Sequence, residues 1–129
     1  LQKAAAGVVA DLAAARAEAA RTYVTVSVCP STTGASCDGA DWTAGRIVFA
    51  DANGNGAVES SEVIRWSEPL DTGVVPSTVG LGTLVAFRPT GAAVGAGSID
   101  LCDSRSGLHG RRVDVNAAGR VTMRELNCP

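Results

Sequence analysis

Residues 2–22 read QKAAAGVVADLAAARAEAART, and this stretch decides the fold. Alanine dominates it, and alanine is the strongest helix former, so the stretch predicts one long helix. Apolar residues recur at steps of three and four and form a single stripe, made of Val8, Leu12, Ala15, Ala19 and Tyr23. Charged residues, Asp11 among them, are predicted to lie largely off this stripe. The helix is therefore amphipathic and needs another layer to pack on.

The period of the sequence changes directly after this helix. TYVTVSVC (22–29) has the β-branched alternation of a strand. Six further short segments follow, each bounded by turn residues: GRIVFAD (45–51), EVIRWSE (62–68), GTLVAFRPTG (82–91), SIDLCDS (98–104), GRRVDVN (110–116) and GRVTMREL (119–126). DVNAAGRV (114–121) predicts a hairpin, and PTGAAVGAGS (89–98) a flexible connector. A helix followed by antiparallel strands indicates an α+β fold, with a helical part at 1–22 and a globular β domain at 23–129.

Composition limits both the core and the binding partners. The chain has 129 residues, which indicates one domain. We expect Trp42 and Trp66 to be core or interface anchors, and because aromatic residues are only 4%, we favour the core. The net charge of −2 argues against a protein that coats nucleic acid with its whole surface. Residues 1–104 carry 6 basic and 11 acidic side chains, whereas 105–129 carry 5 arginines and 2 acids. This asymmetry is either ordinary surface variation or a basic patch for a polyanion.

Four cysteines are present, at positions 29, 37, 102 and 128. Their spacing lacks C-x-x-C, so a zinc ribbon is not indicated, and an even count in a small chain suggests disulfides and an oxidising compartment. Four cysteines allow three pairings. We favour Cys29–Cys37, which closes a loop rich in turn formers, together with Cys102–Cys128, which staples the C-terminal tail to an earlier strand.

Residues 51–62, DANGNGAVESSE, match the calcium loop of an EF-hand in their pattern of oxygen ligands. An EF-hand loop lies between two helices, but the flanking segments here are strand-like. The two Asn-Gly pairs also suit a tight hairpin turn. We therefore predict a hairpin that needs no metal and no cofactor. The alternative is a calcium-binding module, whose oxygen donors would be Asp51, Asn53, Asn55, Glu59 and Glu62.

No residue set suggests catalysis. His109, the only histidine, lies in the glycine- and serine-rich stretch SRSGLHGRR, and one histidine specifies no triad. Motifs for a nucleophile elbow, a zinc protease or a phosphate-binding loop are also absent from the sequence. We therefore expect a structural or binding protein, not an enzyme.

Five segments in this order resemble the soluble domain of the FimT/FimU/GspH family, which comprises minor pilins of type IV pili and pseudopilins of type II secretion. They are LAAARAEAARTYVTVSVC (12–29), DWTAGRIVFADANGNGAVESSEVIR (41–65), VAFRPTG (85–91), SIDLCD (98–103) and GRRVDVNAAGRV (110–121). The resemblance implies a pilin-like head packed on the C-terminal half of a long N-terminal helix, here residues 1–22. It implies a minor pilin of a type IV pilus, or alternatively a type II secretion pseudopilin of GspH type.

The resemblance also implies where the protein works. The sequence contains no signal peptide and no transmembrane run. In the family, a preceding hydrophobic half-helix spans the inner membrane before assembly and then packs in the pilus core. We therefore expect a membrane-anchored precursor with its head in the periplasm, and other pilin or pseudopilin subunits as partners. After assembly the protein would lie in the pilus or at the cell surface.

Some members of the family are implicated in DNA uptake during natural transformation, through a C-terminal G-R-x-R motif. Here the matching position reads Gly119-Arg120-Val121-Thr122, so the second arginine is missing. In a strand, Arg120, Thr122 and Arg124 would point to one face. With the neighbouring strand, the expected contacts to double-stranded DNA are Arg111, Arg112, Arg120 and Arg124.

Overall fold

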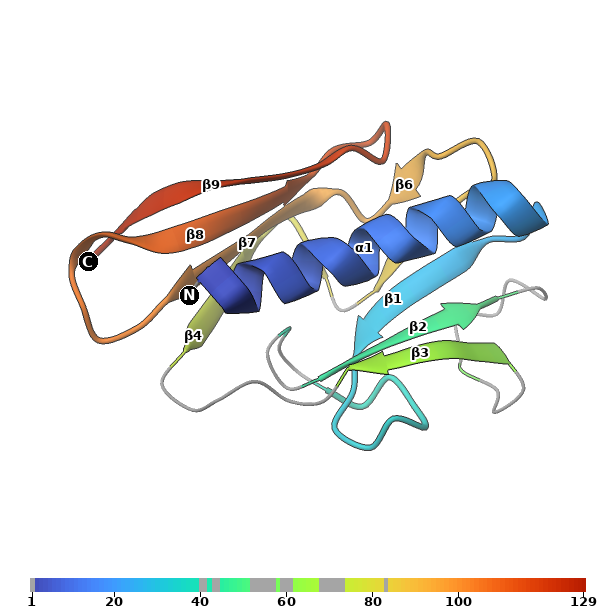
Figure 1. Cartoon of the computed structure of the whole chain (residues 1–129), viewed down its shortest axis with the longest axis horizontal. Helices are drawn as coiled ribbons and strands as arrows, with labels where there is room; N and C mark the ends of the chain where they lie inside the picture. Colours follow the sequence, from blue (N-terminus) through green and yellow to red (C-terminus); the bar gives the residue numbers. More distant parts are fainter. Residues whose placement is uncertain are drawn as a thin grey trace.

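The chain folds as a helix packed on two antiparallel sheets (Figure 1). The computed structural model describes residues 2–39, 42, 45–51, 58, 62–67, 74–82 and 84–129. The α+β class and the order of helix before sheets, both predicted from the sequence, are confirmed. Within the described residues, no helix is both long enough and apolar enough to cross a membrane.

Helix α1 spans Gln2–Thr22, as the alanine content predicts. Val8, Leu12, Ala15 and Ala19 are fully buried, which confirms most of the apolar stripe. Tyr23, predicted as its last member, is 82% exposed. The helix has already ended there: Tyr23 adopts the left-handed conformation, with φ of 59°, and its N–H donates to the Ala19 carbonyl at 3.0 Å. The sequence analysis therefore extended the apolar stripe one residue beyond the end of the helix.

The two sheets divide the strands unequally. The first sheet has the order β3-β2-β1-β5-β6, formed by Val63–Ser67, Arg46–Ala50, Val26–Pro30, Val85–Phe87 and Ala93–Val94. The second has the order β4-β7-β8-β9, formed by Val75–Val79, Gly97–Cys102, Gly107–Val115 and Val121–Cys128. Strand β4 was not predicted, and the expected flexible connector contains β6 and the start of β7. Proline and glycine obscured both segments in the sequence.

The core lies between α1 and the inner faces of both sheets. The helix packs against β1, β2 and β5 of the first sheet and against β8 and β9 of the second (Figure 1). The buried side chains are mostly aliphatic, and those that the sheets contribute to this core include Val26, Val28, Val48, Val85, Phe87, Ile99, Leu101 and Val113. Cys29, Ile47 and Phe49 form a second buried cluster. Burial of each such side chain contributes about 1.5–3 kcal/mol. The same helix face therefore holds the two sheets in one core.

The two tryptophans have different environments. Trp42 is 1% exposed, belongs to this core, and donates its indole N–H to the Gly82 carbonyl at 3.1 Å. Trp66 is 36% exposed on edge strand β3, so its prediction as a core residue was wrong. Its ring covers the backbone of Gly34 and Gly45, where added Cβ atoms would lie 3.1 and 2.9 Å from ring carbons.

One buried polar cluster joins the helix to the first sheet. Asp11, predicted to lie off the buried stripe, is 0% exposed, and Arg46 is 2% exposed. Arg46 Nε donates to Asp11 Oδ2 at 2.6 Å, and Ser67 Oγ donates to Asp11 Oδ1 at 3.0 Å. Arg65 completes the carboxylate contacts, with 2.9 Å between its Nε and Asp11 Oδ1. The prediction failed because a charge that is this fully paired can be buried.

The antiparallel register of β2 and β3 assembles this cluster. Arg46 is directly opposite Ser67, and Val48 is opposite Arg65. Residues opposite one another share a face of the sheet, so Arg46, Ser67 and Arg65 share the face that buries Val48. The second Arg46 contact runs from Nη1 to the Trp42 carbonyl at 2.9 Å. The pairing of two strands thus presents three donors to one helical carboxylate.

Two disulfides join the cysteine pairs favoured by the sequence analysis. Cys29–Cys37 closes a loop after β1 with a sequence separation of 8, and its Cα atoms are 5.6 Å apart. Cys102–Cys128 has a separation of 26 and a Cα distance of 6.0 Å, and it links the end of β7 to the end of β9. This second bond passes over β8 at Gly110, where an added Cβ would lie 2.4 Å from the Cys128 sulfur.

We predict that Asp11→Asn destabilises the fold strongly, because it leaves the Arg46 guanidinium buried without its counter-charge. The free energy of unfolding should fall by about 3–5 kcal/mol, the usual effect of breaking a buried ion pair. Urea denaturation followed by circular dichroism measures this change. Glu18→Gln is the matched control, since it removes a carboxylate from the same helix whose ion pair is with the exposed Arg21. An Asp11→Asn midpoint equal to that of the wild type would contradict this role.

Candidate functional site

The predicted hairpin is formed by β8 and β9, and its turn is specified by two residues. Asn116 donates its N–H to the Arg120 carbonyl at 3.1 Å and accepts the Arg120 N–H on its side-chain oxygen at 2.9 Å. Gly119 takes the left-handed conformation, with φ of 84°, which favours glycine. The segment Asn116–Arg120 therefore places Arg120 in the turn, before β9 begins at Val121.

Arg112 and Arg124 lie side by side on the outer face of the second sheet, where they are directly opposite in register. Both are paired with carboxylates. Arg112 binds Asp100 through two contacts, Nε–Oδ1 at 2.5 Å and Nη2–Oδ2 at 2.7 Å, and this hydrogen bonding raises the pKa of Arg112. Arg124 Nε donates to Asp114 Oδ2 at 3.2 Å. The positive charge at this face is therefore largely neutralised by carboxylates from β7 and β8.

The other two expected DNA contacts, Arg111 and Arg120, are not part of this register pair. Arg111 alternates with Arg112 along β8, so it shares the helix-facing side of the sheet with Val113, and its register partner is Glu125. Its Nη1 donates to the Gly110 carbonyl at 2.8 Å. Arg120 is exposed in the turn, and its guanidinium has neither a hydrogen bond nor an ion pair to any described residue. Arg111 and Arg124 line one shallow hollow together with Met123 and Glu125, so three of the four arginines lie near one another and Arg120 stands apart.

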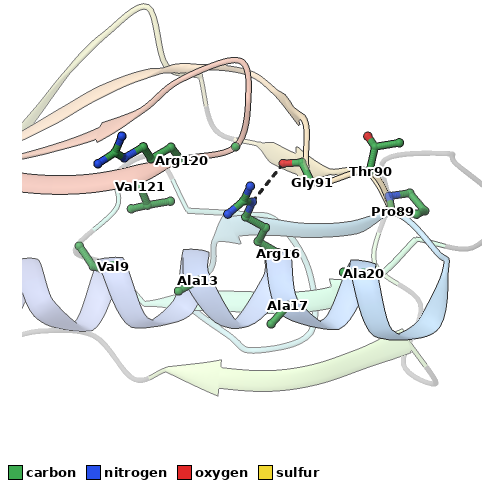
Figure 2. A pocket seen from close by; sticks show the side chains of 11 residues that line it. Val9, Ala13, Arg16, Ala17, Ala20, Pro89, Thr90, Gly91, Arg120 and Val121 are labelled. Atoms are coloured by element: carbon green, nitrogen blue, oxygen red, sulfur yellow. Dashed lines mark hydrogen bonds between the residues drawn. The ribbon is translucent and has the colours of Figure 1, made fainter.

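A groove next to Arg120 contains an arginine that the sequence analysis did not identify. Helix α1, the turn at 89–91 and the tip of the β8–β9 hairpin enclose about 410 Å³ (Figure 2). Arg16 extends from the helix across this space, with Nε 3.3 Å from the Gly91 carbonyl oxygen and Nη2 3.4 Å from that of Ala118. No sequence pattern marks Arg16, because its partners are backbone carbonyls 75 and 102 residues away.

The calcium alternative concerns the segment between β2 and β3. These strands pair antiparallel, so the flanks are not the helices of an EF-hand. Of the candidate donors, Asn53, Asn55 and Glu59 lie outside the described residues. Asp51 is buried, and its N–H donates to the Thr25 carbonyl at 2.8 Å. Among the described parts of the chain, no three histidine, cysteine or acidic side chains gather as metal ligands would.

Comparisons with known proteins agree with this architecture. Two crystal structures of the type IV minor pilin FimU from Pseudomonas aeruginosa, in space groups P65 and P21, have similar folds. The first has a TM-score of 0.76 at 20% sequence identity, with 100% of both chains covered. The second has a TM-score of 0.75 at 19% identity, with 100% of this chain and 95% of FimU covered. At such identities the likeness establishes the fold.

Two further comparisons concern the sequence alone. A search of curated proteins finds no match. The family model described as "Type II transport protein GspH" matches residues 4–119, which is most of the 129-residue chain. The match begins within α1 and ends at the turn between β8 and β9, so it includes the helix and nearly all the strands. The chain therefore belongs to the GspH family.

Proposed function

We propose that this chain is the head of a minor pilin and that it is incorporated into a type IV pilus beside other pilin subunits. The observation that carries the proposal is the likeness to the minor pilin FimU over the full length of both chains. The helix adds physical support. Its buried stripe holds the head, while Ala6, Ala10 and Ala17 leave small exposed side chains on other parts of its surface.

The proposal includes a location. In a pilin, the helix continues into a hydrophobic half that anchors the precursor in the inner membrane, with the head in the periplasm. Two disulfides suit an oxidising compartment such as the periplasm. The alternative proposal is a type II secretion pseudopilin, because the matching family model carries the GspH description. The two machines share this architecture, so the test must measure both outputs.

We predict that deletion of the gene in its own organism reduces surface pili and twitching motility and leaves protein secretion unchanged. Reintroduction of the full-length gene should restore pili. The variant Ala10→Glu should restore fewer pili, because it places a charge on the exposed side of α1, where neighbouring helices would pack. Ala35→Glu, at an exposed position between Cys29 and Cys37 and away from the helix, is the matched control and should restore pili fully.

Electron microscopy counts the pili, and assays of exported enzymes measure secretion. Loss of secretion with normal pili would overturn the pilus assignment in favour of the pseudopilin. Normal pili and normal secretion in the deletion strain would contradict both assignments.

We also propose weak binding of double-stranded DNA, carried by the exposed cation at the hairpin tip. Arg120 is the expected DNA contact whose guanidinium has no partner among the described residues. Arg111 donates to a carbonyl and forms no ion pair with a described carboxylate. Arg112 and Arg124 would have to exchange Asp100 and Asp114 for phosphates. Arg111 and Arg120 are therefore available to contact the phosphate backbone. Such contacts depend little on the DNA sequence and strongly on the salt concentration.

The number of available arginines predicts how the affinity for DNA depends on salt. Each neutralised phosphate adds about 0.9 to the slope of log affinity against log salt, so two arginines give about −1.8, whereas four would give about −3.6. Affinity at physiological salt should be about 10⁻⁴–10⁻⁶ M, as for non-specific binding. Fluorescence anisotropy with a short duplex at several salt concentrations measures both quantities.

Arg120→Gln should flatten this slope by about 0.9. Arg105→Gln is the matched control: it removes the same charge from the β7–β8 loop, where Arg105 binds Asp103 and lowers the pKa of that carboxyl to about 2. Equal binding by the two variants and the wild type at low salt would show that the hairpin arginine does not contact DNA.

For the segment 51–62 we propose a strand connection that does not depend on calcium. The antiparallel pairing of β2 with β3 supports this proposal, since a hairpin is the simplest link between such neighbours. Thermal melts with calcium and with a chelator should therefore coincide. A ligand at 100 times its dissociation constant adds about 2.7 kcal/mol of stability, so real binding would be visible. A calcium-dependent rise in melting temperature would support the calcium module instead.

A further inference from the structure

The groove beside Arg16 combines an apolar floor with two cations. Helix α1 contributes Val9, Ala13, Ala17 and Ala20, and β9 contributes Val121 from the other side (Figure 2). Arg16 and Arg120 line the same space, and no acidic side chain is among the described residues around it. An occupant that matches this surface has an apolar body and a negative group.

The groove is held open by contacts that do not depend on an occupant. The hairpin turn and the 89–91 turn touch through Gly119 and Gly91, so closely that a Cβ on Gly119 would lie 1.7 Å from the Gly91 carbonyl oxygen. Arg16 fastens the same two turns to the helix through its bonds to Gly91 and Ala118. The walls are therefore fixed before binding, which lowers the ordering cost that an occupant must overcome.

The two arginines are suited to complementary roles. Arg16 is oriented by its carbonyl bonds, which occupy Nε and one position on Nη2 and leave its Nη1 without a partner among the described residues. Arg120 carries an uncompensated charge at the rim. The other lining residues are alanine, valine, glycine, threonine and proline, so the two arginines are the charged groups among the described residues of an otherwise apolar groove.

We propose that this groove docks an acidic side chain flanked by apolar residues on a neighbouring pilin subunit. Charge complementarity selects the carboxylate, and the apolar floor favours a peptide over the phosphate backbone of DNA, which has little apolar surface to bury there. That the peptide belongs to a pilin subunit rests on the proposed function. The binding of an acidic peptide in the groove does not rest on it. The peptide binding and the pilin assignment can therefore be tested separately.

The experiment is an NMR titration of the ¹⁵N-labelled domain with two short peptides that differ in one group. The probes are acetyl-Ala-Leu-Glu-Leu-Ala-amide and the same peptide with glutamine in place of glutamate. The acidic peptide should shift the amide resonances of Ala13, Ala17, Gly91, Gly119 and Val121. The glutamine peptide should bind about fivefold more weakly, the upper end of what a partly exposed ion pair contributes.

Two variants separate docking in the groove from general attraction. Ala17→Leu fills the groove without changing the charge and should abolish the shifts. Ala35→Leu makes the same change at an exposed position between Cys29 and Cys37, which does not line the groove, and should leave binding intact. Equal affinity for both peptides, or an equal effect of both variants, would overturn the proposal.

A DNA duplex is the third titrant. If DNA shifts the groove resonances and the acidic peptide does not, the groove is a phosphate contact and the peptide proposal fails. If the acidic peptide docks but the gene deletion leaves pili intact, the groove chemistry stands and the pilin assignment fails. If pili are lost on deletion but neither peptide binds, the pilin assignment stands without this docking site.

Discussion

The position of helix α1 on the two sheets depends on the buried carboxylate of Asp11. Asp11 lies on the one helix of the described chain and receives Arg46 and Ser67 from two paired strands. Hydrophobic burial alone would allow an alanine-rich helix to slide or rotate on the sheets, because small side chains interlock poorly. The charged contact has one satisfactory geometry, since a buried arginine without its partner costs several kcal/mol. It therefore fixes the position of the helix, while the aliphatic core supplies most of the stability.

A fixed helix in turn fixes the hairpin at the other end of the chain. Arg16 lies five positions after Asp11 and reaches the carbonyls of Gly91 and Ala118 from the same helix. The groove, the turn at 89–91 and the exposed Arg120 are thus placed relative to the first sheet through α1. This arrangement explains how a head with few aromatic residues presents a defined surface, because backbone carbonyls and glycines set its shape.

The sequence predicted those features that depend on local patterns. The alanine-rich helix, the hairpin around Asn116 and the pairing of the cysteines follow from propensity, turn chemistry and loop length. Prediction from the sequence failed where the burial or pairing of a side chain depends on residues far away in the chain. Asp11 was expected off the buried stripe because its hydrogen-bond donors lie on strands far along the chain. Trp66 was expected in the core because the sequence does not show that β3 is an edge strand, where one side chain can remain partly exposed. The arginines were grouped by proximity in sequence, whereas the alternation of β8 and the nearby carboxylates divide them.

The Cys102–Cys128 bond gives the second sheet an unusual mechanical property. An edge strand at a chain terminus ordinarily peels away residue by residue from its free end. Here the end of β9 is fastened across β8 to β7, with Gly110 leaving room for the crossing sulfur. The covalent ring encloses the whole β8–β9 hairpin, so a pulling force cannot unzip it from the C-terminus. Separation would have to begin at the turn, where the contacts of Gly91, Gly119 and Arg16 are concentrated. A force applied beyond Cys128 would therefore be carried by the disulfide and not by the hydrogen bonds of β9.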